Sequence, residues 1–390
     1  MAFKFCSLAP EFQLEVLKEL DHDSLASASR VNRSISADVM PLLWEDIDFQ
    51  STGDWYGDIL DRMRDFFLVC DELQRNRPSR WRQLATYVHT LKLVPTPGTG
   101  IPFEDNNGSG FNWVMMKEER SIFDIIADFS RLRCLPVYCK ISIDDISSDT
   151  VLRMHDALPE LRELAIGGNI DRGVVLGLLS YPENMETLAV INLQDCQAGQ
   201  ERHSGGLLFL EPLAPRFTSL TYLHLCKLAE LVSSEREVTN LRWDFDYEND
   251  RAVLSDWAML LPHVSSTLEE LTLEDRYLVS VYNPKVREPI SPGDGEGNDP
   301  REWGEGSRKR FGEIILPVLN SQEWPKLQRL ILTGVVLDGT KESDEKVKRY
   351  LRNLHSRLDV EIWPGRFVEF SDEVTPIEIS PPESPFGVHG

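Results

Sequence analysis

The chain has 390 residues, of which 41% are hydrophobic and 27% are charged, and these proportions are typical of a soluble globular protein rather than a disordered one. This length suffices for two or three average domains or for one extended array of repeats. The formal net charge of -23 argues against a protein that binds the phosphate backbone of nucleic acids, because such binding needs clustered lysine and arginine.

Three short helices are predicted between residues 8 and 49. The first begins at Pro10, which suits the opening turn of a helix because its missing N–H is not needed there, and it runs to Leu20. The second is predicted to begin at Asp23 or Ser24, which are both good N-cap residues. The third is predicted from apolar residues at helical spacing, which are Ile35, Val39 and Leu43.

The first predicted helix carries more apolar surface than one core requires. At about 100° per residue, its apolar side chains spread over roughly 200° of arc, whereas a helix packed on one core needs somewhat more than about 100°. These side chains are Phe12, Leu14, Val16, Leu17 and Leu20. A unit of about forty residues is also too small to be stabilised easily by its own core. We therefore expect the surplus to contact the rest of this chain or another protein.

The same segment contains an ordered set of residues with a definite spacing. The set is Leu8-Ala9-Pro10-Glu11, Val16-Leu17, Leu20-Asp21, Ser24-Leu25, Arg30-Val31, Arg33 and Pro41-Leu42-Leu43-Trp44. This pattern resembles the F-box, which is a small helical module that docks on a Skp-type adaptor of a cullin-based ubiquitin ligase. The family often has Cys where Asn32 stands and an aromatic residue where Ile35 stands.

The resemblance implies which residues would contact the adaptor. Carried over position by position, the adaptor-binding candidates are Leu8, Pro10, Glu11, Val16, Leu17, Leu20, Leu25 and Val31. The alternative interpretation is that the helices form an N-terminal cap that packs on the following domain.

From Tyr87 onward one short phrase recurs, in which an apolar residue is followed three positions later by Leu and then, after one residue, by another apolar residue. Copies of the phrase begin at Val88, Leu161, Met185, Leu220, Val238, Leu268 and Leu327, and less complete copies lie at residues 132–135 and 358–362. This phrase is the L-x-x-L-x-L core of a leucine-rich repeat. The central leucines Leu164 and Leu188 are about 24 residues apart, but Leu271 and Leu330 are about 59 apart, so insertions are expected.

Segments with helical periodicity lie between these phrases, at residues 121–129, 150–158, 174–181, 252–261, 311–319 and 346–354. We therefore predict an α/β fold. An N-terminal three-helix F-box-like module would be followed by an irregular leucine-rich-repeat solenoid, with parallel strands inside and helices outside.

The predicted division of the chain assigns residues 1–50 to the F-box-like helical module and residues 51–370 to the leucine-rich-repeat solenoid. Insertions rich in Gly and Pro are predicted at about 95–112 and 283–307. Residues 371–390 are predicted to form a disordered Pro-rich tail.

Side chains alternate along a strand, so the residues between the repeated leucines are expected on the concave face of the solenoid. The substrate-binding candidates on this face are His224, Arg242, Asp244, Asp246, Glu274, Asp359 and Glu361. The same parity also places Lys92, Ala165, Ala189 and Thr272 there, and it predicts that Trp243, Phe245 and Tyr247 are buried. A basic segment of a target could lie along the acidic half. A solvated acidic face without a ligand is the alternative.

The acidic run from Asp244 to Asp250 is the strongest candidate for a metal site, and it fails as a calcium loop. Asn249 stands where the loop needs Gly, and Ser255 stands where it needs a bidentate Glu. The pair Asp244 and Asp246 could also serve a metal-dependent transferase, but no phosphate-binding Gly-rich motif accompanies it. We predict no catalytic residue, no cofactor and no metal.

The six cysteines form no C-x-x-C pair, which suits a reducing compartment. The N-terminus has no basic-then-apolar signal, and no apolar run reaches the roughly 18 residues of a membrane span. These features predict a cytoplasmic or nuclear protein without a membrane partner.

By the resemblance, the chain would be the substrate-recognition adaptor of an SCF-type E3 ubiquitin ligase and would not itself be an enzyme. Its F-box would bind a Skp-type adaptor, and through it a cullin ligase, while the repeats would bind an unknown target protein, with a basic protein as one candidate. Two alternatives stay open. One is a leucine-rich-repeat scaffold unconnected to ubiquitin, and the other is the metal-dependent transferase.

Overall fold

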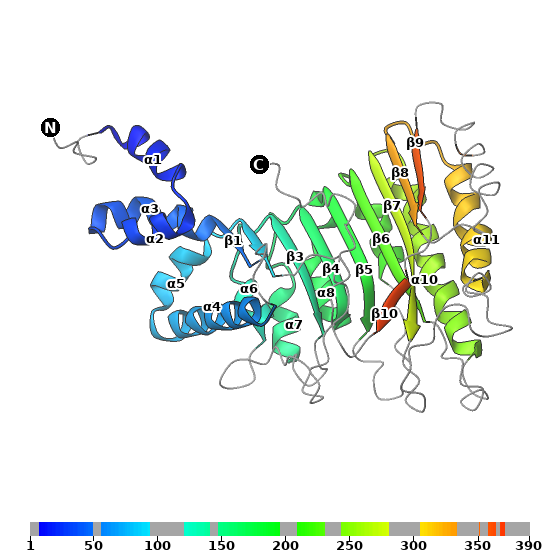
Figure 1. Ribbon diagram of the computed structural model, residues 1–390, viewed down its shortest axis with the longest axis horizontal. Helices are drawn as coiled ribbons and strands as arrows, with labels where there is room; N and C mark the ends of the chain where they lie inside the picture. The colour runs from blue at the N-terminus through cyan, green and yellow to red at the C-terminus, as the bar shows by residue number, and fades with distance from the viewer. Residues whose placement is uncertain are drawn as a thin grey trace.

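The computed structural model describes residues 8–49, 56–93, 121–140, 147–195, 209–230, 243–280, 305–333, 351, 358–363 and 367–370. This part of the chain is a mixed α/β structure built on a ten-stranded sheet. A group of N-terminal helices lies at one end of the sheet, and further helices follow its length (Figure 1). The predicted α/β class with a parallel sheet is therefore confirmed.

The N-terminal helices are α1 (Pro10–Lys18), α2 (His22–Ala28) and α3 (Arg33–Glu45). Pro10 opens α1 as predicted. Helix α2 begins earlier than predicted, because the Asp21 carboxylate accepts a hydrogen bond from the Ser24 backbone N–H at 2.7 Å and so serves as the N-cap. The Asn32 side chain caps α3 in the same way, accepting from the backbone N–H of Ile35 at 2.9 Å.

The end of α3 is joined to the sheet by strand pairing and by aromatic packing. The chain passes from α3 into β1 (Asp46–Asp48), so the sheet begins inside the range predicted for the helical module. Two helices that the sequence did not predict follow, α4 (Tyr56–Asn76) and α5 (Pro78–Ala85). The ring of Trp44 lies 5.9 Å from Phe66 in α4 and 6.4 Å from Trp81 in α5, measured between centroids.

The sheet is parallel in every pairing between described strands. Each strand from β1 to β9 lies beside the strand that precedes it in the chain, while β10 pairs with β7. The strands after β1 are β2 (Thr90–Lys92), β3 (Cys134–Lys140), β4 (Glu163–Ile170), β5 (Thr187–Asp195), β6 (Tyr222–Glu230), β7 (Glu270–Ser280), β8 (Arg329–Thr333), β9 (Asp359–Trp363) and β10 (Phe367–Phe370).

The recurring phrase predicts these strands closely. From β2 to β8 each strand begins two residues after the first apolar residue of its phrase, as Leu161 and Glu163 of β4 illustrate. The incomplete copies at residues 132–135 and 358–362 also correspond to strands, β3 and β9. Strands β1 and β10 lack the phrase and were not predicted.

One copy of the phrase was interpreted wrongly. The copy that begins at Val238 was expected to form a strand through Trp243, but Trp243 is the first residue of helix α10 (Trp243–Val264). Later turns of α10 bury Leu254, Trp257 and Leu261 in the core. Helix propagation from these packed turns is cooperative, and it overrides the alternating aromatic pattern at the start of the helix. Residues 238–242 lie outside the described part of the chain.

Five of the six predicted helical segments overlap a helix of the structure, and for the sixth, residues 346–354, only Leu351 is described and it is helical. The observed helices are α6 (Ile122–Ile126), α7 (Ser148–Met154), α8 (Arg172–Leu178), α9 (Leu210–Leu213), α10 and α11 (Glu305–Ser321), with 3-10 turns at Pro182–Asn184 and Ala214–Arg216. Helix α11 begins inside the insertion predicted at 283–307. Residues 95–112, the rest of that insertion and the predicted tail at 371–390 lie outside the described residues.

The main core lies between the sheet and these helices. It runs from Ile47 in β1 to Val360 in β9 and contains the repeated leucines together with helix residues such as Phe123 and Leu254. A separate buried cluster of Ala165, Ala189, Ile191 and Cys226 lies on the other side of the sheet. The alternation predicted from strand parity is therefore present. We call the side opposite the leucines the non-helical face.

Candidate functional site

The first candidate surface is a group of exposed apolar side chains on the N-terminal helices. The exposed fractions are 65% for Phe12, 38% for Leu14, 44% for Val16 and 66% for Val31. Phe12 and Val16 are four residues apart on α1 and therefore lie on one side of that helix. We call this set the N-terminal apolar surface. Leu14 lies on another side of α1, and Val31 lies in the turn after α2. Exposed apolar residues that share one side of a helix, as Phe12 and Val16 do, mark interaction sites more often than isolated ones do.

The N-terminal helices also have a small core of their own. Leu17, Leu25, Ile35 and Val39 are buried together, with Leu20, Leu42 and Leu43 packed around them. Only a part of the apolar arc of α1 is therefore covered within the described structure. Ile35, which stands where the F-box family often has an aromatic residue, fills this core.

The adaptor-binding candidates consequently divide into three groups. Pro10, Glu11, Val16 and Val31 are exposed, whereas Leu8 and Leu20 are half-buried. Leu17 and Leu25 are buried within the helical module, with exposed fractions of 2% and 7%. The prediction that these two side chains would contact an adaptor is not supported by their position, because they hold α1 and α2 against α3. The candidates omitted Phe12 and Leu14, although the width of the apolar arc on α1 pointed to both.

A polar contact at Asp128 fixes α4 and α5 on the sheet region. This carboxylate accepts hydrogen bonds from the indole N–H of Trp81, from Gln74 Nε2 at 2.6 Å and from the Arg153 guanidinium at 3.0 Å. Gln74 belongs to α4, Trp81 to α5 and Arg153 to α7. Since Trp81 also packs on Phe129 and Trp44, the N-terminal helices and the sheet are linked by both aromatic and polar contacts.

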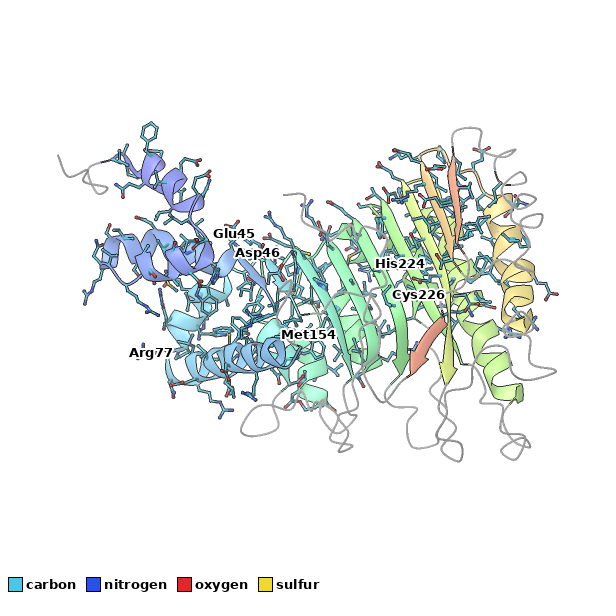
Figure 2. All side chains as sticks on the ribbon, viewed as in Figure 1. Glu45, Asp46, Arg77, Met154, His224 and Cys226 are labelled. Atoms are coloured by element: carbon cyan, nitrogen blue, oxygen red, sulfur yellow. The ribbon has the colours of Figure 1, made fainter. Side chains whose placement is uncertain are left out.

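The second candidate surface is the non-helical face of the sheet. The strand register aligns one residue from each of nine strands in a single row, which we call the polar row. Its members are Asp46, Thr90, Cys134, Glu163, Thr187, Tyr222, Glu270, Arg329 and Asp359. All of them are at least partly exposed. Asp46 lies at the end beside the N-terminal helices, whereas His224, from the next row, lies far along the sheet (Figure 2).

The predicted substrate-binding residues fall mostly outside the polar row. Asp359 belongs to it, while His224 and Glu361 lie in the next row, two residues further along their strands. Glu274 is only 5% exposed, and its carboxylate lies 3.1 Å from Nε2 of His224. Lys92, Ala165, Ala189 and Thr272, which the same parity had placed on the concave face, are also buried.

Three further predicted residues need correction or lie outside the described structure. Asp244 and Asp246 belong to helix α10, so strand parity does not apply to them. The side chains of Asp244 and Asp246 themselves lie outside the described part of the chain. Arg242 lies outside the described residues, as do the side chains of Trp243, Phe245 and Tyr247, whose burial was predicted.

The cations of the polar row and of the row beside it are engaged by carboxylates of the same face. Lys92 Nζ lies 3.1 Å from the Asp48 carboxylate, and Arg329 Nε donates to the Glu361 carboxylate at 2.8 Å. Desolvation raises the pKa of Asp46, although Lys92 opposes this shift. Desolvation also raises the pKa of Tyr222 to about 12. The polar row is therefore an acidic surface with hydrogen-bonding groups in its middle.

Two observations concern metal-binding and nucleophilic side chains among the described residues. They contain no group of three or more His, Cys, Asp or Glu side chains arranged to hold a metal ion. Burial raises the pKa of the Cys70 and Cys134 thiols far above neutrality, so both are poor nucleophiles.

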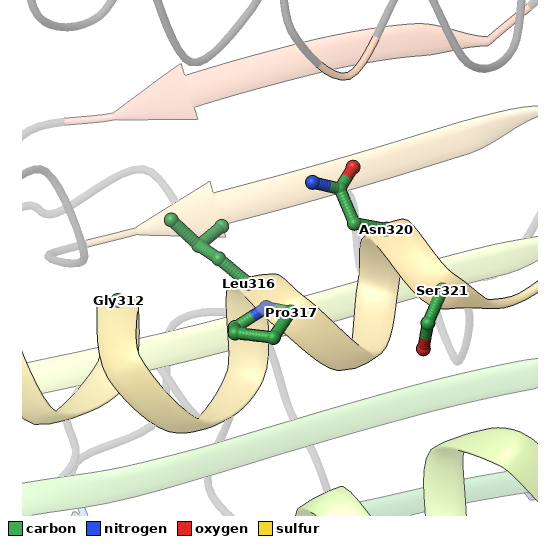
Figure 3. A pocket seen from close by; sticks show the side chains of 5 residues that line it. All are labelled: Gly312, Leu316, Pro317, Asn320 and Ser321. Carbon is green, nitrogen blue, oxygen red and sulfur yellow. The ribbon is translucent and has the colours of Figure 1, made fainter.

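A hollow on α11 is lined by residues of that helix alone (Figure 3). The lining residues are Gly312, Leu316, Pro317, Asn320 and Ser321. A hollow on one helix lacks the convergent polar groups from several elements that ligand sites usually have.

No helix in the described ranges combines the length and the apolar character that crossing a bilayer requires. No protein-family model matches the sequence, and no curated protein matches it either.

Proposed function

We propose that this protein is the substrate-recognition adaptor of an SCF-type E3 ubiquitin ligase. The N-terminal helices would bind a Skp-type adaptor. The sheet region, which we interpret as an irregular leucine-rich-repeat solenoid, would bind the target protein. The observation that supports this proposal most is the N-terminal apolar surface, formed by Phe12, Leu14, Val16 and Val31.

The energetic argument for a partner rests on the size of these side chains. Burying a Val, Leu or Phe side chain contributes about 1.5–3 kcal/mol relative to leaving it in water. The surface therefore offers several kcal/mol of binding energy to a protein that covers it. Its position on helices whose sequence resembles the F-box makes a Skp-type adaptor the partner of choice.

The proposed role requires no bond chemistry from this chain. An adaptor acts by proximity, since it raises the effective concentration of a target lysine near the transferring enzyme. Such a role benefits from a fixed distance between the two binding surfaces. The packing of Trp44 on Phe66 and Trp81, together with the contacts of Asp128, supports a firm connection of this kind.

The test is co-purification of the full chain with a Skp-type adaptor. The triple variant Phe12→Ala, Val16→Ala, Val31→Ala should bind at least about 100-fold more weakly, because interface truncations at buried anchor positions cost 1 kcal/mol or more each. The control is Leu152→Ala with Met259→Ala, which removes apolar side chains that are 72% and 48% exposed elsewhere on the surface. Equal adaptor binding by both variants, or none by the unmodified chain, would overturn the proposal.

A repeat scaffold without a ligase is the second candidate. It is favoured by one observation, the packing of Trp44 against α4 and α5, which is also what a structural N-terminal cap would show. Under this alternative the chain binds its target but does not co-purify with the adaptor.

A further inference from the structure

We infer that the polar row on the non-helical face binds an extended, basic peptide segment that crosses the strands. This inference deepens the proposed function, since it names the class of target that the sheet region would hold. It differs from the sequence-based expectation in its location, because only Asp359 of the predicted residues belongs to the polar row.

The register of the sheet gives the polar row its shape. One side chain from each of the nine strands from β1 to β9 lies on the same level, from Asp46 at one end to Asp359 at the other. Neighbouring strands are about 4.8 Å apart, so the row is about 38 Å long. An extended peptide advances about 3.3 Å per residue and would need about 12 residues to cover it.

The residues beside the middle part of the polar row have short side chains. The next residues along β4 and β5 on this face are Ala165 and Ala189, which are buried and carry short side chains. An extended main chain can approach such a surface closely. Thr187 and Tyr222, which lie in the row at this point, can hydrogen-bond to a peptide backbone.

The charge of the row selects a basic ligand. Asp46, Glu163, Glu270 and Asp359 supply four carboxylates, whereas Arg329 is the one cation among the nine row residues and is already bonded to Glu361. A matching basic segment would be steered toward this face, and an acidic one would be repelled.

The spacing of these carboxylates predicts a spacing of basic residues in the ligand. Three strand steps separate Asp46 from Glu163 and Glu163 from Glu270, and two separate Glu270 from Asp359. These steps correspond to about 14, 14 and 10 Å at the usual strand separation. Side chains alternate along an extended peptide, so only lysines an even number of positions apart face the same surface. The steps therefore match lysines at positions i, i+4, i+8 and i+12, to within a residue.

The direct test is fluorescence anisotropy with the full chain and a labelled probe peptide of about 13 residues, which is long enough to cover the row. The probe carries lysines at its first, fifth, ninth and thirteenth positions, with serine and threonine elsewhere. A second peptide has the same composition with the four lysines contiguous, and a third has glutamate in place of lysine. We expect the first peptide to bind at least 10-fold more tightly than the second, and the third not to bind. Equal binding of the first two peptides, or no binding of the first at low salt, would overturn the inference.

Two matched variants separate the row from general charge. The row variant combines Asp46→Asn, Glu163→Gln, Glu270→Gln and Asp359→Asn. The control combines Asp65→Asn, Asp149→Asn, Glu211→Gln and Glu313→Gln, which removes the same charge from exposed positions on helices. The row variant should lose at least 10-fold in affinity for the spaced peptide, and the control should lose less than 3-fold. Equal losses would show that only net charge matters and would contradict the inference.

A charge exchange keeps the result interpretable if the row variant folds poorly. The variant Glu163→Lys with Glu270→Lys should prefer a peptide with glutamate at its fifth and ninth positions over the original probe. No exchange of preference in a folded variant counts against the inference. None of these assays contains a Skp-type adaptor. A failure of peptide binding would therefore not affect the co-purification result, and a failure of co-purification would not affect the peptide-binding result.

Discussion

At the scale of single residues, carboxylates that accept several hydrogen bonds hold neighbouring elements together. Asp256 in α10 is buried and accepts hydrogen bonds from the backbone N–H groups of Phe209, Leu210 and Glu211, at 3.2, 3.0 and 2.7 Å. It thereby supplies acceptors for the first turn of α9, which has no side-chain cap of its own. Asp128 acts similarly between α4, α5 and α7.

Replacing Asp128 by Ala should destabilise the junction. The buried Trp81 indole N–H and Gln74 would lose their acceptor, and hydrogen bonds to a charged group contribute about 1.5–3 kcal/mol each at most. We expect the free energy of unfolding to fall by about 2 kcal/mol in a denaturant titration. The matched control is Asp149→Ala, an exposed carboxylate in α7, which should change stability by less than about 0.5 kcal/mol. A similar loss in both variants would contradict the assigned role of Asp128.

The raised pKa of Tyr222 predicts that the stability of the protein depends on pH in the alkaline range. Desolvation is the main cause that raises the pKa of its phenol to about 12, and Glu270 adds to the shift while a hydrogen bond to Thr272 opposes it. An acid with a raised pKa in the folded state contributes stability that is fully present below the unfolded value of 10.0 and is lost as the pH rises through about 12.

The phenol of Tyr222 can be separated from other alkaline titrations by substitution. Tyr222→Phe should show a shallower loss of stability between about pH 10 and 12 than the unmodified protein. The difference should reach at most about 3 kcal/mol, measured by denaturation at several pH values. Identical pH profiles would show that the phenol titrates in the same way in both states.

At the scale of elements, helices α7 and α8 pack closely because α8 carries glycines on the contact side. A Cβ atom placed on Gly177 would lie 2.7 Å from Cβ of Met154 and 3.1 Å from the Met154 backbone carbonyl carbon. Neither neighbour is the end of a flexible side chain. The two helices therefore approach one another to a distance that a larger residue does not permit.

Gly177→Ala should consequently destabilise the protein, although alanine favours a helix by about 1 kcal/mol relative to glycine. The clash with the backbone of α7 should cost more than this gain, giving a net loss of about 1–3 kcal/mol in a thermal or denaturant experiment. Ser148→Ala, an exposed substitution in α7, provides a control for the same helix pair. A Gly177→Ala protein with raised stability would mean that the helices separate without cost.

At the scale of the whole molecule, the connection between the N-terminal helices and the sheet is decisive for any role that uses both ends. The end of α3 enters the sheet through β1, and Trp44 packs against Phe66 and Trp81. The N-terminal core of Leu17, Leu25, Ile35 and Val39 is separate from the main core. The aromatic contacts are therefore a principal link between the two cores.

Trp44→Ala should loosen this link without unfolding either core. Truncating a large aromatic side chain costs about 3–5 kcal/mol when it is fully buried and less for a partly buried one such as Trp44. We expect a larger radius of gyration in small-angle X-ray scattering and an unchanged helical signal in circular dichroism. Leu152→Ala, which truncates an exposed side chain, should leave the radius unchanged. An unchanged radius of gyration in Trp44→Ala would mean that other contacts link the two cores.

The sequence by itself determined the strands and most helices of the sheet region. A leucine phrase such as the one from Leu161 to Ile166 buries one side of a short strand, and this requirement is local, so its periodicity predicts β4 without knowledge of its neighbours. The apolar arc of α1 likewise predicted a surface that the described structure leaves partly exposed at Phe12 and Val16.

Only the tertiary structure decided which residues are accessible. Strand parity assigned Glu274 and Asp359 to the same face, but cross-strand packing buries Glu274 beside His224 and leaves Asp359 exposed. Asp244 and Asp246 joined a helix because later turns of α10 pack on the core. Such outcomes depend on contacts between residues far apart in the chain, and a local pattern carries no information about those contacts.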